Sequence, residues 1–162
     1  MKDEWFVIWV ATGQETELLP RIARIPRVME AFSPRLPLWE RRHGEWQLNE
    51  RYAFPGYIFV RCRMDSEIYY AVRELPGVLG WLGRDTLWPT TVQEEEMEAV
   101  LALHRGIAPE KVLADIRANR RGRRAYGSIT LQGVQYRIPY NIYQETDKQA
   151  ESPTGDASPA EG

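Results

Sequence analysis

Few residues of this sequence are of the types that carry out catalysis or bind metal ions. The 162 residues include one cysteine, Cys62, and two histidines, His43 and His104. A zinc site needs several Cys or His ligands at short spacings, and neither histidine has such a neighbour. Glu94–Glu96 fits the acidic first turn of a helix, and Gly77–Gly80 fits no phosphate-binding loop. The sequence therefore predicts a protein that is not an enzyme, with no cofactor and no metal site.

Arginine is concentrated in parts of the chain, and guanidinium groups are well suited to bind phosphate. Residues 107–140 hold seven basic and two acidic residues, a net charge of +5, whereas residues 141–162 sum to −4. Charge pattern alone leaves open a solvated surface or a contact with nucleic acid. The candidates for nucleic-acid binding are Arg21, Arg24, Arg117, Arg120, Arg121, Arg123 and Arg124.

The most distinctive pattern is a group of aromatic residues around a Pro-Gly pair, within Tyr52–Val60. Alternation along a strand places Tyr57 and Phe59 on one face and the residues between them on the other. One interpretation is an exposed row of rings in which a helical partner buries apolar side chains. The alternative, which the pattern alone favours, is that helices cover both faces of the sheet and every ring belongs to the core. The exposed row would hold Tyr57 and Phe59, and Trp9 and Trp81 on other strands could extend it.

Local patterns predict an α+β fold in which helices flank a mainly antiparallel sheet. Trp5–Val10 is apolar throughout, as expected of a central strand with both faces buried. Capping boxes at Thr12–Glu15 and Thr91–Glu94 predict the starts of two helices, and Asp65 or Ser66 predicts the start of a third. The expected order is β-α-β-β-β-α-β-α, with strands at Leu38–Arg41, Trp46–Leu48, Tyr57–Cys62 and Val78–Leu82 and a hairpin tip at Arg42–Glu45.

The composition changes after Gly106, which divides the chain into three parts. Residues 1–106 form the predicted α+β domain, residues 107–143 a basic appendage, and residues 144–162 an acidic tail with too few apolar residues to fold. The appendage combines a short helix at 109–118 with a β-hairpin whose strands flank Gln132-Gly133. No apolar run reaches ~18 residues and the N-terminus has no signal-peptide pattern, so we expect a cytoplasmic protein without membrane attachment.

Several motifs follow one another in a characteristic order: Trp5–Ile8, Thr12-Gly13, Phe54–Val60, Leu75–Val78 and Trp81–Gly83. This series resembles the N-terminal domain of the NusG/RfaH family of transcription elongation factors. The resemblance covers residues 4–105, about two-thirds of the chain, and fits a specialised, LoaP-like or RfaH-like paralog.

The resemblance implies a monomeric, non-enzymatic protein that binds RNA polymerase. In this family an aromatic pocket binds the clamp helices of the β′ subunit and a loop approaches the β subunit, which favours the elongating state. The matching positions for polymerase binding are Trp9, Phe54, Pro55, Tyr57, Phe59 and Trp81. Arg21 and Arg24 match the helix with which specialised relatives contact non-template DNA, whereas Ala11 and Tyr69-Tyr70 depart from the family pattern.

The C-terminal part departs most from the family, because the Gly-Pro-Phe turn of the usual KOW barrel does not occur after residue 106. One interpretation of the appendage is a degenerate KOW remnant, and another is a basic hairpin that binds nascent RNA or DNA. The sequence thus predicts an elongation or antitermination factor. The alternative is a stand-alone module that binds RNA or DNA through the arginine cluster at 117–124.

Overall fold

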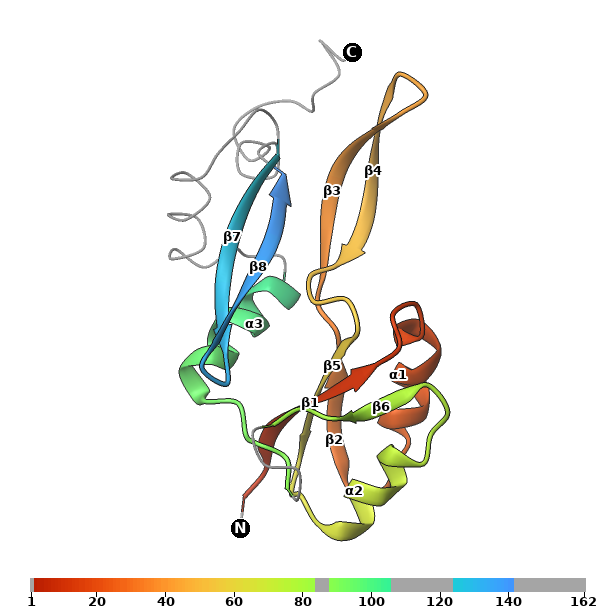
Figure 1. The fold of residues 1–162 in the computed structure, drawn as a ribbon, viewed down its shortest axis with the longest axis vertical. Helices are drawn as coiled ribbons and strands as arrows, with labels where there is room; N and C mark the ends of the chain where they lie inside the picture. The colour runs from red at the N-terminus through yellow and green to blue at the C-terminus, as the bar shows by residue number, and fades with distance from the viewer. Residues whose placement is uncertain (1, 84–87, 106–123, 142–162) are drawn as a thin grey trace.

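The computed structural model describes residues 2–83, 88–105 and 124–141. It has the predicted α+β architecture (Figure 1). One strand that was not predicted, Val28–Phe32, precedes the hairpin formed by Arg35–Arg42 and Glu45–Tyr52. The elements are β1 (Glu4–Val10), α1 (Glu15–Ala23), β2 (Val28–Phe32), β3 (Arg35–Arg42), β4 (Glu45–Tyr52), β5 (Tyr57–Cys62), α2 (Ser66–Arg73), β6 (Val78–Trp81), α3 (Glu94–His104), β7 (Arg124–Leu131) and β8 (Val134–Asn141).

The centre of the fold is a four-stranded antiparallel sheet in the order β2-β5-β1-β6. Strand β1 lies inside the sheet, as its apolar sequence predicted, and Phe6, Val7 and Ile8 on it are all buried. It pairs with β5 so that Ile8 lies opposite Ile58 and Trp9 opposite Tyr57. Because facing residues share a side of the sheet, this register decides which rings meet.

Each face of the sheet is covered by a different set of elements. On one face, Ile58 and Val60 pack with residues of α1 and α2. On the other, Phe59 packs with α3 and with Ile129 and Ile138 of the β7–β8 hairpin. The sheet is therefore buried on both sides, and the C-terminal hairpin contributes to the same core as the N-terminal part of the chain.

Two of the three predicted helix caps differ in detail from the structure. Helix α2 is capped as predicted, with the Asp65 carboxylate accepting from the Ile68 N–H at 2.9 Å. Helix α3 has its capping box two residues later than predicted, between Gln93 and Glu96. The predicted Thr12–Glu15 box is wrong, because Gln14 is the N-cap of α1 and makes no side-chain cap bond, and Glu15 binds elsewhere.

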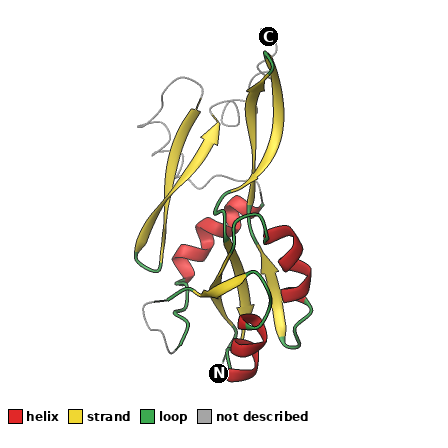
Figure 2. Ribbon diagram, turned by 45° about the vertical axis from the view of Figure 1, so that its right-hand side comes forward, coloured by secondary structure: helices red, strands yellow, loops and turns green. Residues whose placement is uncertain are grey.

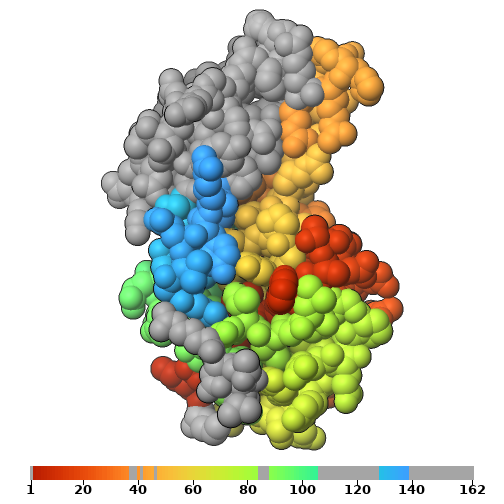
Figure 3. Space-filling view, viewed as in Figure 1, coloured from red at the N-terminus to blue at the C-terminus, as the bar shows by residue number. Residues whose placement is uncertain are grey.

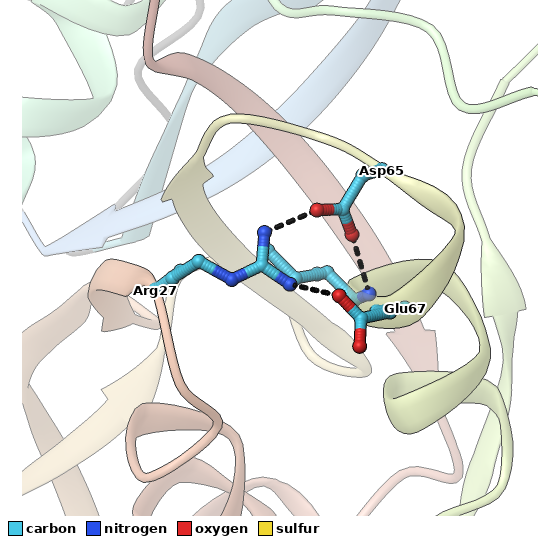
Figure 4. Close-up of polar contacts among 4 residues, drawn as sticks. Arg27, Asp65 and Glu67 are labelled. Atoms are coloured by element: carbon cyan, nitrogen blue, oxygen red, sulfur yellow. Dashed lines mark hydrogen bonds and ion pairs between the residues drawn. The ribbon is translucent and has the colours of Figure 1, made fainter.

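Arg27 connects the entry to β2 with the start of α2 (Figure 4). Its guanidinium forms ion pairs with Asp65 and, at 2.9 Å, with Glu67. The hydrogen bond from Arg27 holds the pKa of the Asp65 carboxyl below its ordinary value, helped by the bond from Ile68. All three charged side chains lie near the surface, so we assign this group a positioning role and only a small share of the stability.

Strands β3 and β4 form an arm that extends away from the sheet and helices (Figure 2), whereas the β7–β8 hairpin packs against α3 near its turn. The arm turns at His43-Gly44 and the second hairpin at Gln132-Gly133, and all four residues have positive φ. Paired positive φ values are typical of the tight turns that match strand twist. Both predicted hairpins are thus confirmed, whereas the predicted helix at 109–118 lies outside the described residues. No helix among the described residues is long and apolar enough to cross a membrane.

The arm should lose order in acid, because one of its carboxylates is held ionised by its neighbours. Glu40 accepts hydrogen bonds from Arg51 at 2.8 Å and Asn49 at 2.9 Å, and these lower its pKa from 4.5 to about 2. A lowered native pKa gives stability that is complete above pH 4.5 and disappears as the pH falls toward 2. We expect the protection factors of the amide hydrogens in β3 and β4 to fall over this window, and to fall less in Glu40→Gln. Equal pH dependence in both proteins would contradict the assignment.

Candidate functional site

The Pro-Gly corner between β4 and β5 is fixed by a buried carboxylate from α1. Glu15 is 2% exposed, and its oxygens accept from the Gly56 N–H at 2.6 Å and the Gly13 N–H at 2.9 Å. Gly56 has φ +87°, and an added Cβ would lie 3.2 Å from the Val10 carbonyl oxygen. A backbone bend of this shape favours glycine, which accounts for the residue type at this position.

The corner brings four aromatic residues together on one face of the sheet, and we call Trp9, Phe54, Tyr57 and Phe59 the ring site. Phe54 and Phe59 meet edge to face with centroids 5.5 Å apart. Trp9 lies directly across the strand pair from Tyr57. Pro55, at the corner itself, is exposed. The alternation predicted for Tyr57 and Phe59 is confirmed by their shared cluster.

The prediction that these rings form an exposed row is wrong for Phe54 and Phe59, and Tyr57 is half-buried. Phe54 is 3% exposed and Phe59 is fully buried, whereas Trp9 remains 49% exposed. The cover is the β7–β8 hairpin, whose Tyr136 contacts Phe54 and Tyr57 edge to face at 6.1 and 5.5 Å. Figure 3 shows the hairpin (blue) lying directly against the segment that carries the Pro-Gly corner (yellow). Sequence reasoning treated this hairpin as an appendage and so missed that it covers the rings.

The hairpin turn is held by polar contacts as well as by its apolar residues. The Glu96 carboxylate accepts from the Gln132 N–H at 3.0 Å while it also closes the cap of α3. The Gln132 side-chain amide donates to the Thr90 carbonyl at 2.8 Å. Burial, with the hydrogen bond to Tyr57, raises the pKa of the Tyr136 phenol above its ordinary value. Only Glu96 has a charged side chain among these contacts.

Trp81 does not extend the ring site, which corrects its predicted position. It pairs with Ile8 across β1 and β6, and its ring packs on Phe6 on the opposite face of the sheet. There it stacks with Tyr69, which also stacks with the exposed Trp88. This second aromatic group was missed because its members come from four separate segments with no common spacing.

The structure describes only some of the candidate arginines. Arg21 and Arg24 are exposed on and just after α1, and Arg21 pairs with Glu17 at 3.4 Å. Arg117, Arg120, Arg121 and Arg123 lie outside the described residues, and only the backbone of Arg124 is described.

Cys62 is not placed for nucleophilic chemistry. Its side chain is fully buried beneath α2, and desolvation raises the pKa of the thiol to about 11. A buried neutral thiol acts as a small apolar side chain. Within the described ranges, no three Cys, His, Asp or Glu side chains are grouped as a metal site would require.

The fold and its corner define a NusG-type α+β domain. A solved structure described as "Domain interaction in Thermotoga maritima NusG" matches with a TM-score of 0.56 and 17% identity, over 89% of this chain and 96% of that chain. The family described as "Transcription termination factor nusG" matches residues 3–101, more than half of the chain. The chain therefore belongs to the NusG family, which consists of transcription factors and not of enzymes.

Curated relatives named "Transcription termination/antitermination protein NusG" agree with this assignment. The protein from Halalkalibacterium halodurans is 30% identical over 110 residues, which cover 62% of this chain and 62% of that protein. The protein from Pseudomonas aeruginosa is 26% identical over 108 residues, which cover 62% of this chain and 61% of that protein. The likeness thus extends over about three-fifths of these relatives.

Proposed function

We propose that this protein is a transcription elongation or antitermination factor that docks on the clamp helices of RNA polymerase through the ring site. The observation that carries the proposal is Trp9, a large indole left half exposed beside Tyr57 at the open edge of a cluster of rings. Aromatic anchors next to a concave apolar surface are typical of interface hot spots. Pro55, exposed at the corner, belongs to the same proposed surface.

Docking at the full ring site requires the β7–β8 hairpin to move aside, because Tyr136 covers Phe54 and Tyr57. We therefore propose a covered and an open form in equilibrium, of which the polymerase binds the open one. In this view residues 1–106 are the polymerase-binding unit and residues 107–143 act on it. A role of this kind fits a specialised paralog of the family.

Two exposed tryptophans provide a direct test of the proposed docking surface. Trp9→Ala removes the anchor of the ring site, and Trp88→Ala removes a tryptophan of similar exposure, 45% against 49%, on the other aromatic group. We expect Trp9→Ala to weaken binding to an isolated β′ clamp-helix fragment by about 30-fold, the loss of a ~2 kcal/mol hot spot. Trp88→Ala should bind like the parent protein. Equal affinities for the two variants, both folded by circular dichroism, would contradict docking at the ring site.

A second candidate function is nucleic-acid binding through the arginine cluster at 117–124, with Arg21 and Arg24 as further contacts to non-template DNA. The net charge of +5 over residues 107–140 supports it. Such binding to RNA or DNA would need no polymerase and would fall steeply with salt concentration. We also propose, by analogy with the family, that the protein contacts the β subunit of RNA polymerase.

A further inference from the structure

The turn of the β7–β8 hairpin carries a residue that its local conformation does not favour. Gln132 and Gly133 have φ values of +51° and +80°, the paired left-handed conformation of a tight turn. Asparagine adopts this conformation more readily than glutamine and is the usual first residue of such a turn. The longer amide of Gln132 therefore needs an explanation from outside the hairpin.

The reach of the Gln132 side chain provides that explanation. Its amide nitrogen donates to the Thr90 carbonyl at 2.8 Å and to the Leu82 carbonyl at 3.5 Å. Those two residues are joined to each other, because the Thr90 N–H donates to the Leu82 carbonyl at 3.4 Å. One glutamine side chain thus fastens the hairpin turn to a pair of backbone segments that lie 42 and 50 residues earlier in the chain.

Glu96, in the first turn of α3, binds the backbone of the same hairpin turn. One of its oxygens accepts from the Gln132 N–H at 3.0 Å and from the Gln93 N–H at 3.2 Å, and the other accepts from the Gly133 N–H at 3.4 Å. Hydrogen bonds to a carboxylate are stronger than those between neutral groups. We call Glu96, Gln132 and Gly133 the turn contact.

The turn contact fixes the position of the hairpin more narrowly than its apolar residues do. Burial of apolar surface is not directional, whereas a hydrogen bond requires a defined distance and angle. Tyr136 lies two residues beyond the start of β8, about 7 Å along the strand. The position of the turn therefore determines where this ring meets Phe54 and Tyr57.

We propose that the turn contact sets the balance between the covered and open forms of the ring site, with Gln132 as a positioning residue that directs Tyr136 onto Phe54 and Tyr57. This inference rests on the equilibrium proposed above and names the residues that control it. None of the three residues of the turn contact belongs to the ring site. Changing them alters how often the rings are open and leaves the proposed docking surface itself unchanged.

Gln132→Asn tests the proposal, because it suits the turn better and shortens the amide by one methylene group. We expect the open fraction to rise about fivefold, the effect of losing one hydrogen bond of ordinary net strength. The matched control is Gln135→Asn, the same change at an exposed residue of β8 whose amide donates to Ser128 within the hairpin at 3.3 Å. A structural effect on the turn alone would work in the opposite direction, since asparagine stabilises it.

The open fraction is measured in the full chain by relaxation-dispersion NMR of methyl groups. Ile129 and Ile138 of the hairpin report on opening, and Ile8 and Ile22 in the cluster on the other face of the sheet are the internal reference. Equal open fractions in Gln132→Asn and Gln135→Asn would overturn the proposal.

A second pair of variants tests the carboxylate. Glu96→Gln and Glu95→Gln each remove one negative charge from the first turn of α3, so both weaken the interaction with the helix dipole. Of the two, Glu96 is the residue bound to the hairpin turn. We expect a larger open fraction in Glu96→Gln than in Glu95→Gln, and equal fractions would overturn the role given to Glu96.

Binding of the isolated clamp-helix fragment separates this proposal from the proposed docking. If the fragment binds the open ring site, Gln132→Asn should bind it more tightly than Gln135→Asn, by up to the same factor of about five. A larger open fraction without tighter binding would support the turn contact and contradict docking at the ring site. Tighter binding without a larger open fraction would overturn the role of the turn contact.

Discussion

Tyr136→Ala is expected to bind the clamp-helix fragment about tenfold more tightly than the parent protein. Tyr136 makes edge-to-face contacts with Phe54 and Tyr57 in the covered form. Such pairs contribute roughly 0.5–1.5 kcal/mol each beyond the area they bury. Their loss shifts the equilibrium toward the open form, and the measured affinity rises with the fraction of open molecules. Titration calorimetry with the isolated fragment measures this directly.

Val134→Ala is the matched control, because Val134 lies on the same strand of the hairpin but is 53% exposed. It should leave the affinity unchanged within about twofold. If Tyr136→Ala binds no better than Val134→Ala while both remain folded, then the hairpin does not compete with the clamp helices. The proposed docking surface would then have to be sought away from Phe54 and Tyr57.

Raising the pH should also break the contact of Tyr136 with Phe54 and Tyr57. Burial raises the pKa of Tyr136 in the covered form, so the contact contributes fully below the ordinary tyrosine pKa of 10 and weakens as the pH rises beyond it. We expect fluorescence to show the hairpin opening above pH 10. In Tyr136→Phe, which keeps the ring but cannot ionise, this alkaline opening should be reduced.

The parts of the fold that depend on local sequence were predictable. The apolar run at Trp5–Val10 indicated a central strand, and Gln132-Gly133 indicated a tight hairpin. The cap at Asp65 followed from residue type alone. In each case the residues that carry the pattern also form the structural element or lie within a few positions of it. Local propensity therefore determines the element that forms.

The exposure of the ring site was not predictable, because it depends on residues far away in the chain. Alternation correctly placed Tyr57 and Phe59 on one face, but nothing near them indicates that Tyr136, 79 residues later than Tyr57, covers that face. Trp81 illustrates the same limit, since its side of the sheet follows from the pairing of β1 with β6, in which Trp81 lies opposite Ile8 and the register shifts between Trp9 and Val10. Strand patterns give the faces of a sheet, whereas tertiary packing decides which face stays open.

Glu15→Ala is expected to destabilise the protein by about 3 kcal/mol, the largest effect of any single substitution considered. The Glu15 carboxylate is buried and accepts from two backbone N–H groups, of Gly56 and Gly13. Alanine leaves both donors without this partner, and the cost of about 1–3 kcal/mol for an unsatisfied buried donor falls on the Gly56 N–H, because Gly13 is exposed to water. Urea denaturation followed by circular dichroism gives the change in the free energy of unfolding.

Two further substitutions separate the role of the hydrogen bonds from that of charge on α1. Glu17→Ala removes an exposed carboxylate that pairs with Arg21 at 3.4 Å, and it should change the stability by less than about 0.5 kcal/mol. Glu15→Gln keeps one acceptor oxygen and places an amide donor against the other N–H, so it should fall between Glu15→Ala and the parent protein. Because the Gly56 N–H belongs to the corner between Phe54 and Tyr57, Glu15→Gln should also weaken binding to the clamp-helix fragment at temperatures where it remains folded. A Glu15→Ala protein as stable as Glu17→Ala would show that the corner holds its shape without this carboxylate.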